Sequence, residues 1–174
     1  MVRSALASNR SRLSRGPRRA ALSVPAISVM VASLTALLPI ISSSGGWPDA
    51  GLMMLLAWRL LRADAWPAWA AAGLGLFHDL VTGQPIGLSV ALWPLFMLAM
   101  DIVDRRTMWR DYWLEWMVAS LFLALSEVAQ WRLAASEGAA LPFSAIGPSI
   151  LVSIFCFPIA AALVSRLDRW RFRR

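Results

Sequence analysis

The chain has few of the residues that form disulfides, bind metals or carry out catalysis. It has one cysteine, Cys156, one histidine, His78, and no lysine. A lone cysteine excludes an intrachain disulfide and a cysteine-based metal site. The sequence also lacks a glycine-rich phosphate loop, a histidine-rich motif and a serine in a nucleophile elbow. We therefore expect no cofactor, no metal and no enzymatic activity.

Polar residues are also too scarce to cover a water-soluble globule. Of the 174 residues, 59% are hydrophobic, whereas a soluble domain has about 45–50% apolar residues. The mean hydropathy is +0.60. Ten tryptophans against one tyrosine favour indole rings that anchor helix ends at the lipid headgroups. The composition therefore predicts one all-α integral membrane domain.

Six apolar segments predict a compact bundle of six transmembrane helices, at residues 20–41, 47–61, 66–82, 85–103, 111–134 and 142–163. The second segment is the weakest, because its uninterrupted apolar core at 50–58 is shorter than the roughly 17–25 residues of a membrane helix. Arg59 and Arg62 could lengthen it by snorkelling to the interface. Five helices with a short or re-entrant second helix are the alternative.

Arginines alternate between the connections of this six-helix arrangement. The N-terminal segment, the turn after the second helix, the loop after the fourth helix and the C-terminal segment are basic, and the connections between them are not. Because basic segments stay on the cytoplasmic side, both termini are expected in the cytoplasm. The arginines of these basic segments are Arg3, Arg10, Arg12, Arg15, Arg18, Arg19, Arg59, Arg62, Arg105, Arg106, Arg110, Arg166, Arg169, Arg171, Arg173 and Arg174, and Arg132 lies at the end of the fifth segment.

The same pattern divides the chain into three parts. Residues 1–19 are expected to form a disordered, arginine-rich cytoplasmic tail, 20–166 the six-helix transmembrane domain, and 167–174 a basic cytoplasmic tail. The N-terminal arginines would fix the orientation, and a sharper role is binding anionic lipids at the cytoplasmic face. Nucleic-acid binding is not expected, since the basic run ends directly in an apolar segment.

Polar residues inside the apolar segments mark candidate contacts. Asp79 lies near the outer end of the third helix, and Gly75, Asp79 and Thr82 share one small, polar helix face that suits close helix packing. Such ionisable groups are costly in lipid and usually face protein or a water-filled cavity. We expect structural packing or a partner contact on this face.

A second polar stripe lies on the fifth segment. Glu127 and Gln130 follow each other at helical spacing, and Arg132 lies close to the same level. Either Glu127 or Asp79 paired with Arg132 would avoid an isolated charge in lipid. Structural packing or a partner contact is again the expectation, and a proton or ion path is the alternative.

The turn after Asp79 has residues that fix a backbone. Gly83 and Gly87 allow conformations closed to other residues, and Pro85 suits the start of the fourth helix, where its missing N–H costs little. The Asp79 carboxylate can reach Arg132 or accept N–H groups that open that helix. We therefore expect Asp79, Gly83 and Pro85 to hold a rigid outer hairpin.

Two further acidic patterns are interpreted as structural. His78 and Asp79 are neighbours in sequence, so they point about 100° apart on a helix and form no dyad with each other. Asp101 and Asp104 resemble half of a metal site, but hard metals need several oxygen ligands. We expect these two aspartates to pair with the adjacent Arg105 and Arg106.

The stretch at residues 75–88, GLFHDLVTGQPIGL, resembles a known pattern. It is similar to the G-hydrophobic-x-x-D-hydrophobic-x-x-G-x-P-x-G turn of the rod shape-determining protein MreD family, where it joins two helices of a small multi-pass protein. Length, the arginine-ended fourth helix and the proline-containing last helix are also similar, so the resemblance covers roughly residues 20–166. The long arginine-rich N-terminal segment departs from most members.

The resemblance implies a non-enzymatic role in cell shape. MreD proteins are inner-membrane components of the elongation complex that directs lateral peptidoglycan synthesis. The implied partner is the single-pass protein MreC. The MreB filament, a SEDS glycosyltransferase and its class B penicillin-binding transpeptidase belong to the same complex. The alternative is a transporter, since small six-helix substrate-binding subunits of vitamin transporters have similar size and hydropathy, and a midplane pocket with convergent polar groups would favour it.

Overall fold

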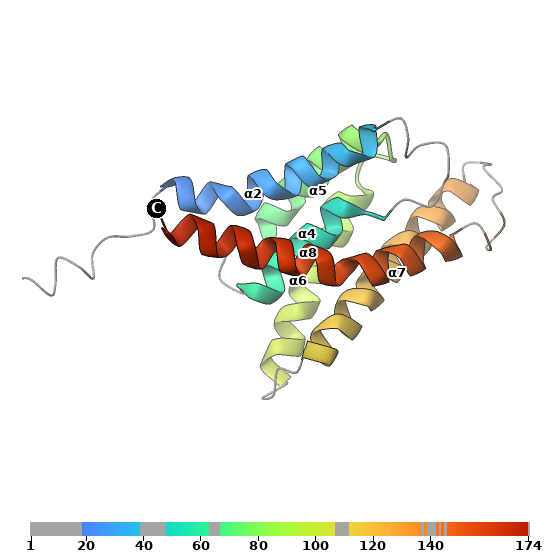
Figure 1. Cartoon of the computed structure of the whole chain (residues 1–174). Helices are drawn as coiled ribbons and strands as arrows, with labels where there is room; N and C mark the ends of the chain where they lie inside the picture. The colour runs from blue at the N-terminus through green and yellow to red at the C-terminus, as the bar shows by residue number, and fades with distance from the viewer. Residues whose placement is uncertain are drawn as a thin grey trace, which may run out of the picture.

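The computed structural model describes residues 19–38, 48–62, 67–106, 112–136, 138, 142, 144 and 146–173. Over these ranges the chain is helical and has no strand, as predicted. The expected disorder of the N-terminal tail and the loops at 39–47 and 107–111 lie outside them. The described ranges contain six α-helices and one 3-10 turn: α2 (Arg19–Leu34), η1 (Thr35–Leu37), α4 (Ala50–Leu61), α5 (Ala68–Thr82), α6 (Leu88–Arg106), α7 (Tyr112–Ser136) and α8 (Gly147–Arg173). Figure 1 shows how the helices are arranged.

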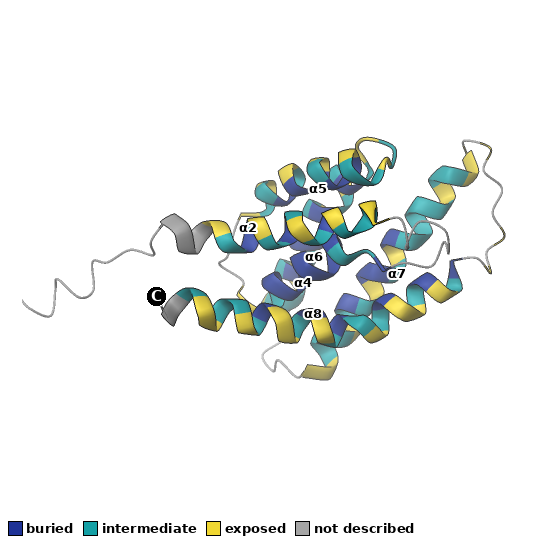
Figure 2. Cartoon of the chain, turned by 45° about the horizontal axis from the view of Figure 1, so that its top comes forward, coloured by how far each residue is buried: buried dark blue, intermediate teal, exposed yellow. Residues whose placement is uncertain are grey.

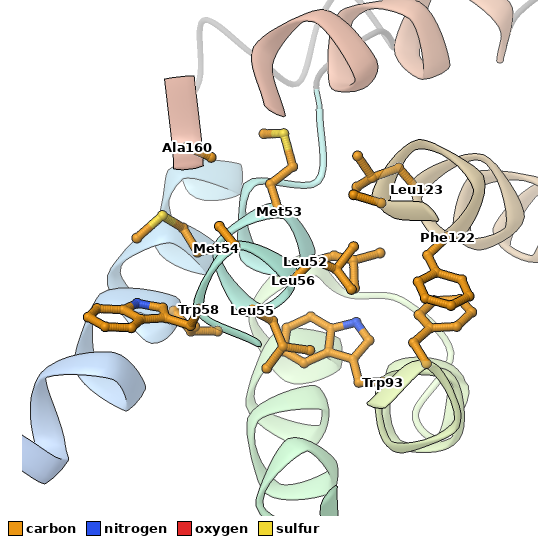
Figure 3. Packing of buried hydrophobic residues seen from close by; sticks show 14 of the residues in the cluster. Leu52, Met53, Met54, Leu55, Leu56, Trp58, Trp93, Phe122, Leu123 and Ala160 are labelled. Carbon is orange, nitrogen blue, oxygen red and sulfur yellow. The ribbon is translucent and has the colours of Figure 1, made fainter. Parts of the chain in front are cut away.

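The short helix α4 forms the centre of the molecule. Every residue from position 51 to 59 is buried, because the sequence Gly-Leu-Met-Met-Leu-Leu-Ala-Trp offers no polar face, and a helix that is apolar all round must be surrounded by protein or lipid. Figure 3 shows its side chains pointing to different sides, with Leu55 beside Trp93 of α6 and Trp58 directed toward α2. The Trp58 indole N–H donates to Ser28 Oγ of α2 at 2.7 Å.

Helix α4 is shorter than the second span expected from the sequence. It has 12 residues, which gives a length of about 18 Å against a hydrocarbon core of about 30 Å. Asp49 caps its start, since Asp49 Oδ1 accepts a hydrogen bond from the Leu52 N–H at 2.8 Å. The second helix is therefore present, but it is shorter than the expected segment at 47–61.

Two helices are long and apolar enough to cross a membrane. They are Tyr112–Ser136 and the 25 residues Gly147–Arg171 of α8. Only 22% and 17% of their most apolar windows are buried in the protein, which sets them apart from the mostly buried core helices of soluble proteins. The other apolar helices over the described residues, at 23–37 and 50–61, are shorter.

Large apolar side chains are exposed on all the outer helices. Figure 2 shows exposed positions along α2, α5, α7 and α8, and they include Trp69, Leu80, Leu121, Phe155 and Ile159. Soluble monomers rarely expose contiguous apolar surface of this extent, and such surfaces mark contact with lipid or with other proteins. Only α4 is free of this exposure over most of its length.

The last helix differs from its expected bounds at both ends. It begins at Gly147, five residues after the expected start, and it continues to Arg173 instead of ending near Leu163. The reason for the extension is side-chain packing. Leu167 packs on the core, and Arg171 pairs with Asp168 at 2.8 Å while its guanidinium lies 5.2 Å from the Trp58 ring centroid. The expected basic tail is 167–174, and residues 167–173 of it belong to helix α8.

Candidate functional site

The turn between α5 and α6 has the backbone that its glycines predict. Gly83 adopts the left-handed conformation, with φ 69° and ψ 19°, and ends α5. Gly87 has a φ of 112°. Both values lie where a side chain is strained. The fourth helix begins at Leu88 and not at Pro85, so Pro85 lies in the turn and its carbonyl accepts the Leu88 N–H at 3.3 Å.

Asp79 closes this turn from inside the bundle. Its side chain is fully buried, with 0% of the residue exposed. Asp79 Oδ2 accepts the Gly87 N–H at 2.8 Å, and Oδ1 accepts the Ser89 N–H at 3.1 Å. These N–H groups open α6 and have no partner within the helix, and the positive end of the helix favours the carboxylate. The structure thus has the second of the two arrangements expected for Asp79.

The pairing expected for Arg132 is wrong. Arg132 is exposed and its guanidinium lies 5.5 Å from the centroid of the adjacent Trp131 ring. Neither Asp79 nor Glu127 forms an ion pair with it among the described residues. The reason is helix geometry, since five residues separate Glu127 from Arg132 and place them about 140° apart around α7.

Gly75 allows the closest approach of α5 to α6. A Cβ at this position would lie 2.5 Å from the Ser89 carbonyl oxygen and 2.6 Å from the Ser89 carbonyl carbon. Both atoms are backbone, so they cannot move without moving α6. Gly75 and Asp79 are four residues apart on one face, as expected, and together they fix α5 against the start of α6.

Replacing Gly75 by alanine should therefore destabilise the protein, while the same change at Gly73 should not. Overpacking at Gly75 should cost about 1–3 kcal/mol. A Cβ at Gly73 would meet no atom within 4 Å, and alanine in a helix interior is favoured over glycine by about 1 kcal/mol. Thermal unfolding of the two purified variants in detergent measures the difference. Equal melting temperatures would show that the contact between α5 and α6 is not tight.

A polar cavity of about 380 Å³ adjoins this hairpin. It lies between the end of α2 with η1, the start of α4, the end of α5, the second half of α7 and the start of α8. Its polar lining residues are Ser33, Thr35, Asp49, His78, Thr82, Gln84, Glu127, Gln130 and Ser149. Glu127 and Gln130, which the sequence analysis singled out, are thus brought together in one site.

His78 forms one wall of the cavity. It is buried, and its Nδ1 lies 3.1 Å from Ser33 Oγ. The Ser33 hydroxyl also lies 3.1 Å from the Val29 carbonyl, and the direction of its hydrogen bond with His78 depends on the imidazole tautomer. His78 Nε2 faces Asp49 Oδ1 at 3.7 Å. His78 and Asp79 have different neighbours, as their spacing predicts.

Two carboxyl groups face the cavity from different helices. Glu127 Oε1 accepts a hydrogen bond from Ser149 Oγ at 2.8 Å. Asp49 Oδ1 caps α4, but Asp49 Oδ2 is buried without a hydrogen-bond partner in the described structure. Sequence reasoning missed Ser33, Asp49 and Ser149. Asp49 has the ordinary signature of a helix cap, and serines within apolar segments resemble packing residues, so no signal at these positions indicates a cavity.

A charged cluster lies at the other end of α4. Arg59 is only 3% exposed and pairs with Asp101 and with Asp104, the latter at 2.9 Å. The expected snorkelling of Arg59 is therefore wrong, and the two aspartates pair with Arg59 and not with Arg105; the Arg106 side chain lies outside the described part of the structure. The reason is burial, because a guanidinium enclosed at the end of α4 requires neutralising partners, whereas Arg105 is exposed.

No protein-family model matches this chain, no curated protein matches it, and no solved structure matches its fold.

Proposed function

We propose that the chain is a multi-pass inner-membrane protein of the MreD type. It would act as a non-enzymatic scaffold in the complex that directs lateral peptidoglycan synthesis and cell shape. The observation that carries this proposal is the Asp79 hairpin. The stretch at 75–88 that resembles MreD is folded as one unit, held by the two hydrogen bonds of Asp79 and by the contact of Gly75 with Ser89. A rigid outer hairpin suits a surface that positions partner helices.

Contacts at the two ends of the bundle support six alternating passes. One end joins Ser33, Asp49, His78, Glu127 and Ser149, which come from α2, the start of α4, α5, α7 and α8. The other end joins Arg59 and Arg62 at the end of α4 to aspartates of α6 and α8. The start of α7 also lies near the end of α4, since Tyr112 and Leu61 line one pocket. Consecutive helices therefore run in opposite directions, α4 included.

The termini support the same orientation. Figure 1 shows the start of α2 and the end of α8 at the same end of the molecule. The segments that continue from them are rich in arginine, which favours the cytoplasmic side. Reporter fusions at Thr107 and Arg174 should give cytoplasmic signals, and a fusion at Ser44 a periplasmic signal. A periplasmic signal at Thr107 or Arg174 would contradict six passes.

The experiment that tests the function is purification of partners. The chain carrying an affinity tag, solubilised from its host in mild detergent, should co-purify with a single-pass protein of the MreC type and with the SEDS glycosyltransferase and its transpeptidase. A multi-pass protein of similar size and abundance, tagged in the same way, is the control. Recovery of an ATP-driven transport module in their place would refute the scaffold proposal.

Recovery of a transport module would support the alternative function, a small-molecule transporter subunit. The polar cavity is an observation that favours a small-molecule transporter subunit, because ligand sites are concave and have a few convergent polar groups. The remaining lining residues are Ala32, Ala36, Pro48, Ala50 and Gly51. A scaffold with a ligand site remains consistent with both observations, so the partners decide between the two functions.

A further inference from the structure

The polar lining of the cavity next to the hairpin includes two carboxyl groups, those of Asp49 and Glu127. Its charged and polar groups are carboxyl, amide, hydroxyl and imidazole groups, and no arginine is among the lining residues that the structure describes. The chain has 17 arginines, yet those whose contacts are described at the ends of α4 and α8 lie in the opposite part of the bundle. This arrangement disfavours an anion in the cavity and favours a cation.

Two acceptor atoms in the cavity lack a donor. Asp49 Oδ2 and Gln84 Oε1 are buried and have no hydrogen-bond partner among the described residues. The Asp49 side chain is 7% exposed. A buried carboxylate oxygen without a donor is costly, and most buried polar atoms in folded proteins have a partner. These atoms therefore point to a ligand that donates hydrogen bonds.

A second carboxyl group, that of Glu127, also lines the cavity and can accept hydrogen bonds from a ligand. Glu127 on α7 lines the same space as Asp49, and Ser149 donates to only one of its oxygens in the contacts described. Among the described residues no group of three or more His, Cys, Asp or Glu side chains could hold a metal ion. A molecule that brings its own donors to both carboxyl groups matches the site better than a bare ion.

We infer that this cavity binds a small organic amine in its protonated, cationic form, with ammonium groups directed to Asp49 and Glu127. The volume of about 380 Å³ is at the lower end of the roughly 300–1,000 Å³ of small-molecule sites. Gln84 accepts a further N–H at the mouth formed by the turn after α5. His78, held by Ser33, forms a fixed polar wall. This site is additional to the scaffold function and does not depend on it.

Isothermal titration calorimetry on the purified full chain in detergent tests the inference. The probes are 1,4-diaminobutane and spermidine, with 1,4-butanediol and succinate as neutral and anionic controls at constant ionic strength. We expect saturable binding of at least one amine and none of the controls. Absence of saturable binding for both amines, or equal binding of the diol, would overturn the inference.

Matched variants locate the site. Asp49→Asn keeps a residue that caps helices well and should weaken amine binding about tenfold or more, because a hydrogen bond to a charged group contributes about 1.5–3 kcal/mol. Gln84→Ala, in the turn, should weaken it less. Glu115→Gln makes the same kind of change at the other end of α7 and should leave binding unchanged. If Asp49→Asn and Gln84→Ala, each with a normal unfolding transition, bind the amine as the wild type does, the assignment to this cavity is wrong.

Discussion

Replacing Arg59 by alanine should remove most of the folded protein from the membrane. Arg59 is the one charged residue in the nine-residue buried run of α4, and it joins α4 to α6 through Asp101 and Asp104. Removing one partner of a fully buried ion pair costs about 3–5 kcal/mol, and because the Asp101 and Asp104 side chains are 46% and 27% exposed, we expect a loss at the lower end of this range. This is a large share of the roughly 5–15 kcal/mol by which most proteins are stable. Both aspartates would also lose their common partner.

Arg62→Ala is the matched control for this change. Arg62 also pairs with an aspartate, Asp168 at 3.2 Å, but its side chain is 44% exposed, and exposed pairs contribute about 0–1 kcal/mol. Arg59→Lys should be intermediate, because lysine keeps the positive charge but replaces the guanidinium nitrogen that contacts both carboxylates, Arg59 Nη2, with the ammonium of a differently shaped side chain. Membrane abundance by immunoblot and thermal unfolding in detergent measure all three. Equal losses for the alanine variants would show that the buried cluster does not hold α4.

Asp79→Ala should have the next largest effect, through the start of α6. The change removes the acceptor for the N–H groups of Gly87 and Ser89, and Ser89 is buried with 2% of its surface exposed. Each hydrogen bond to a charged group contributes about 1.5–3 kcal/mol, so we expect a loss of about 3 kcal/mol or more. Asp79→Asn should lose less, since its carbonyl oxygen still accepts one of the two N–H groups.

Thr82→Val is the control for Asp79. Its hydroxyl donates to the His78 carbonyl within the same helix at 2.8 Å, and removing it leaves the contact between α5 and α6 intact. We expect a change below about 1 kcal/mol. Unfolding of the purified proteins in urea or by heat gives the comparison. If Asp79→Ala unfolds at the wild-type midpoint, the hairpin is held by other contacts.

The hairpin could be predicted from sequence because its determinants are local. Gly83 and Gly87 have positive φ values, which glycine adopts more readily than other residues. Asp79 lies only eight and ten residues from the two N–H groups whose hydrogen bonds it accepts. One spacing along the chain therefore fixes the geometry. The sequence could not show whether Asp79 pairs with Arg132 or accepts the N–H groups at the start of α6, since the rotation of α7 about its axis depends on packing.

The charged cluster and the cavity could not be predicted, because their members are distant in sequence. Arg59 is 42 residues from Asp101, and Ser33 is 45 residues from His78. The arginines nearest in sequence are the expected partners of Asp101 and Asp104. Both aspartates instead pair with Arg59, because a buried guanidinium requires neutralising partners. Likewise, the apolar run of α4 indicates burial but not whether lipid or protein surrounds it, and here the surrounding groups belong to the other helices (Figure 3).

The central claim is that the hairpin held by Asp79 positions a partner helix. A photo-crosslinking amino acid placed at Leu80, which is 62% exposed on α5, tests it in cells of the native host, with the same label at Ile159 of α8, 69% exposed, as the control. The account predicts a crosslink from Leu80 to a single-pass protein of the MreC type. That crosslink should be weaker in Asp79→Asn at equal membrane abundance and absent from Ile159. A crosslink that is unchanged by Asp79→Asn, or that forms from Ile159 and not from Leu80, would contradict it.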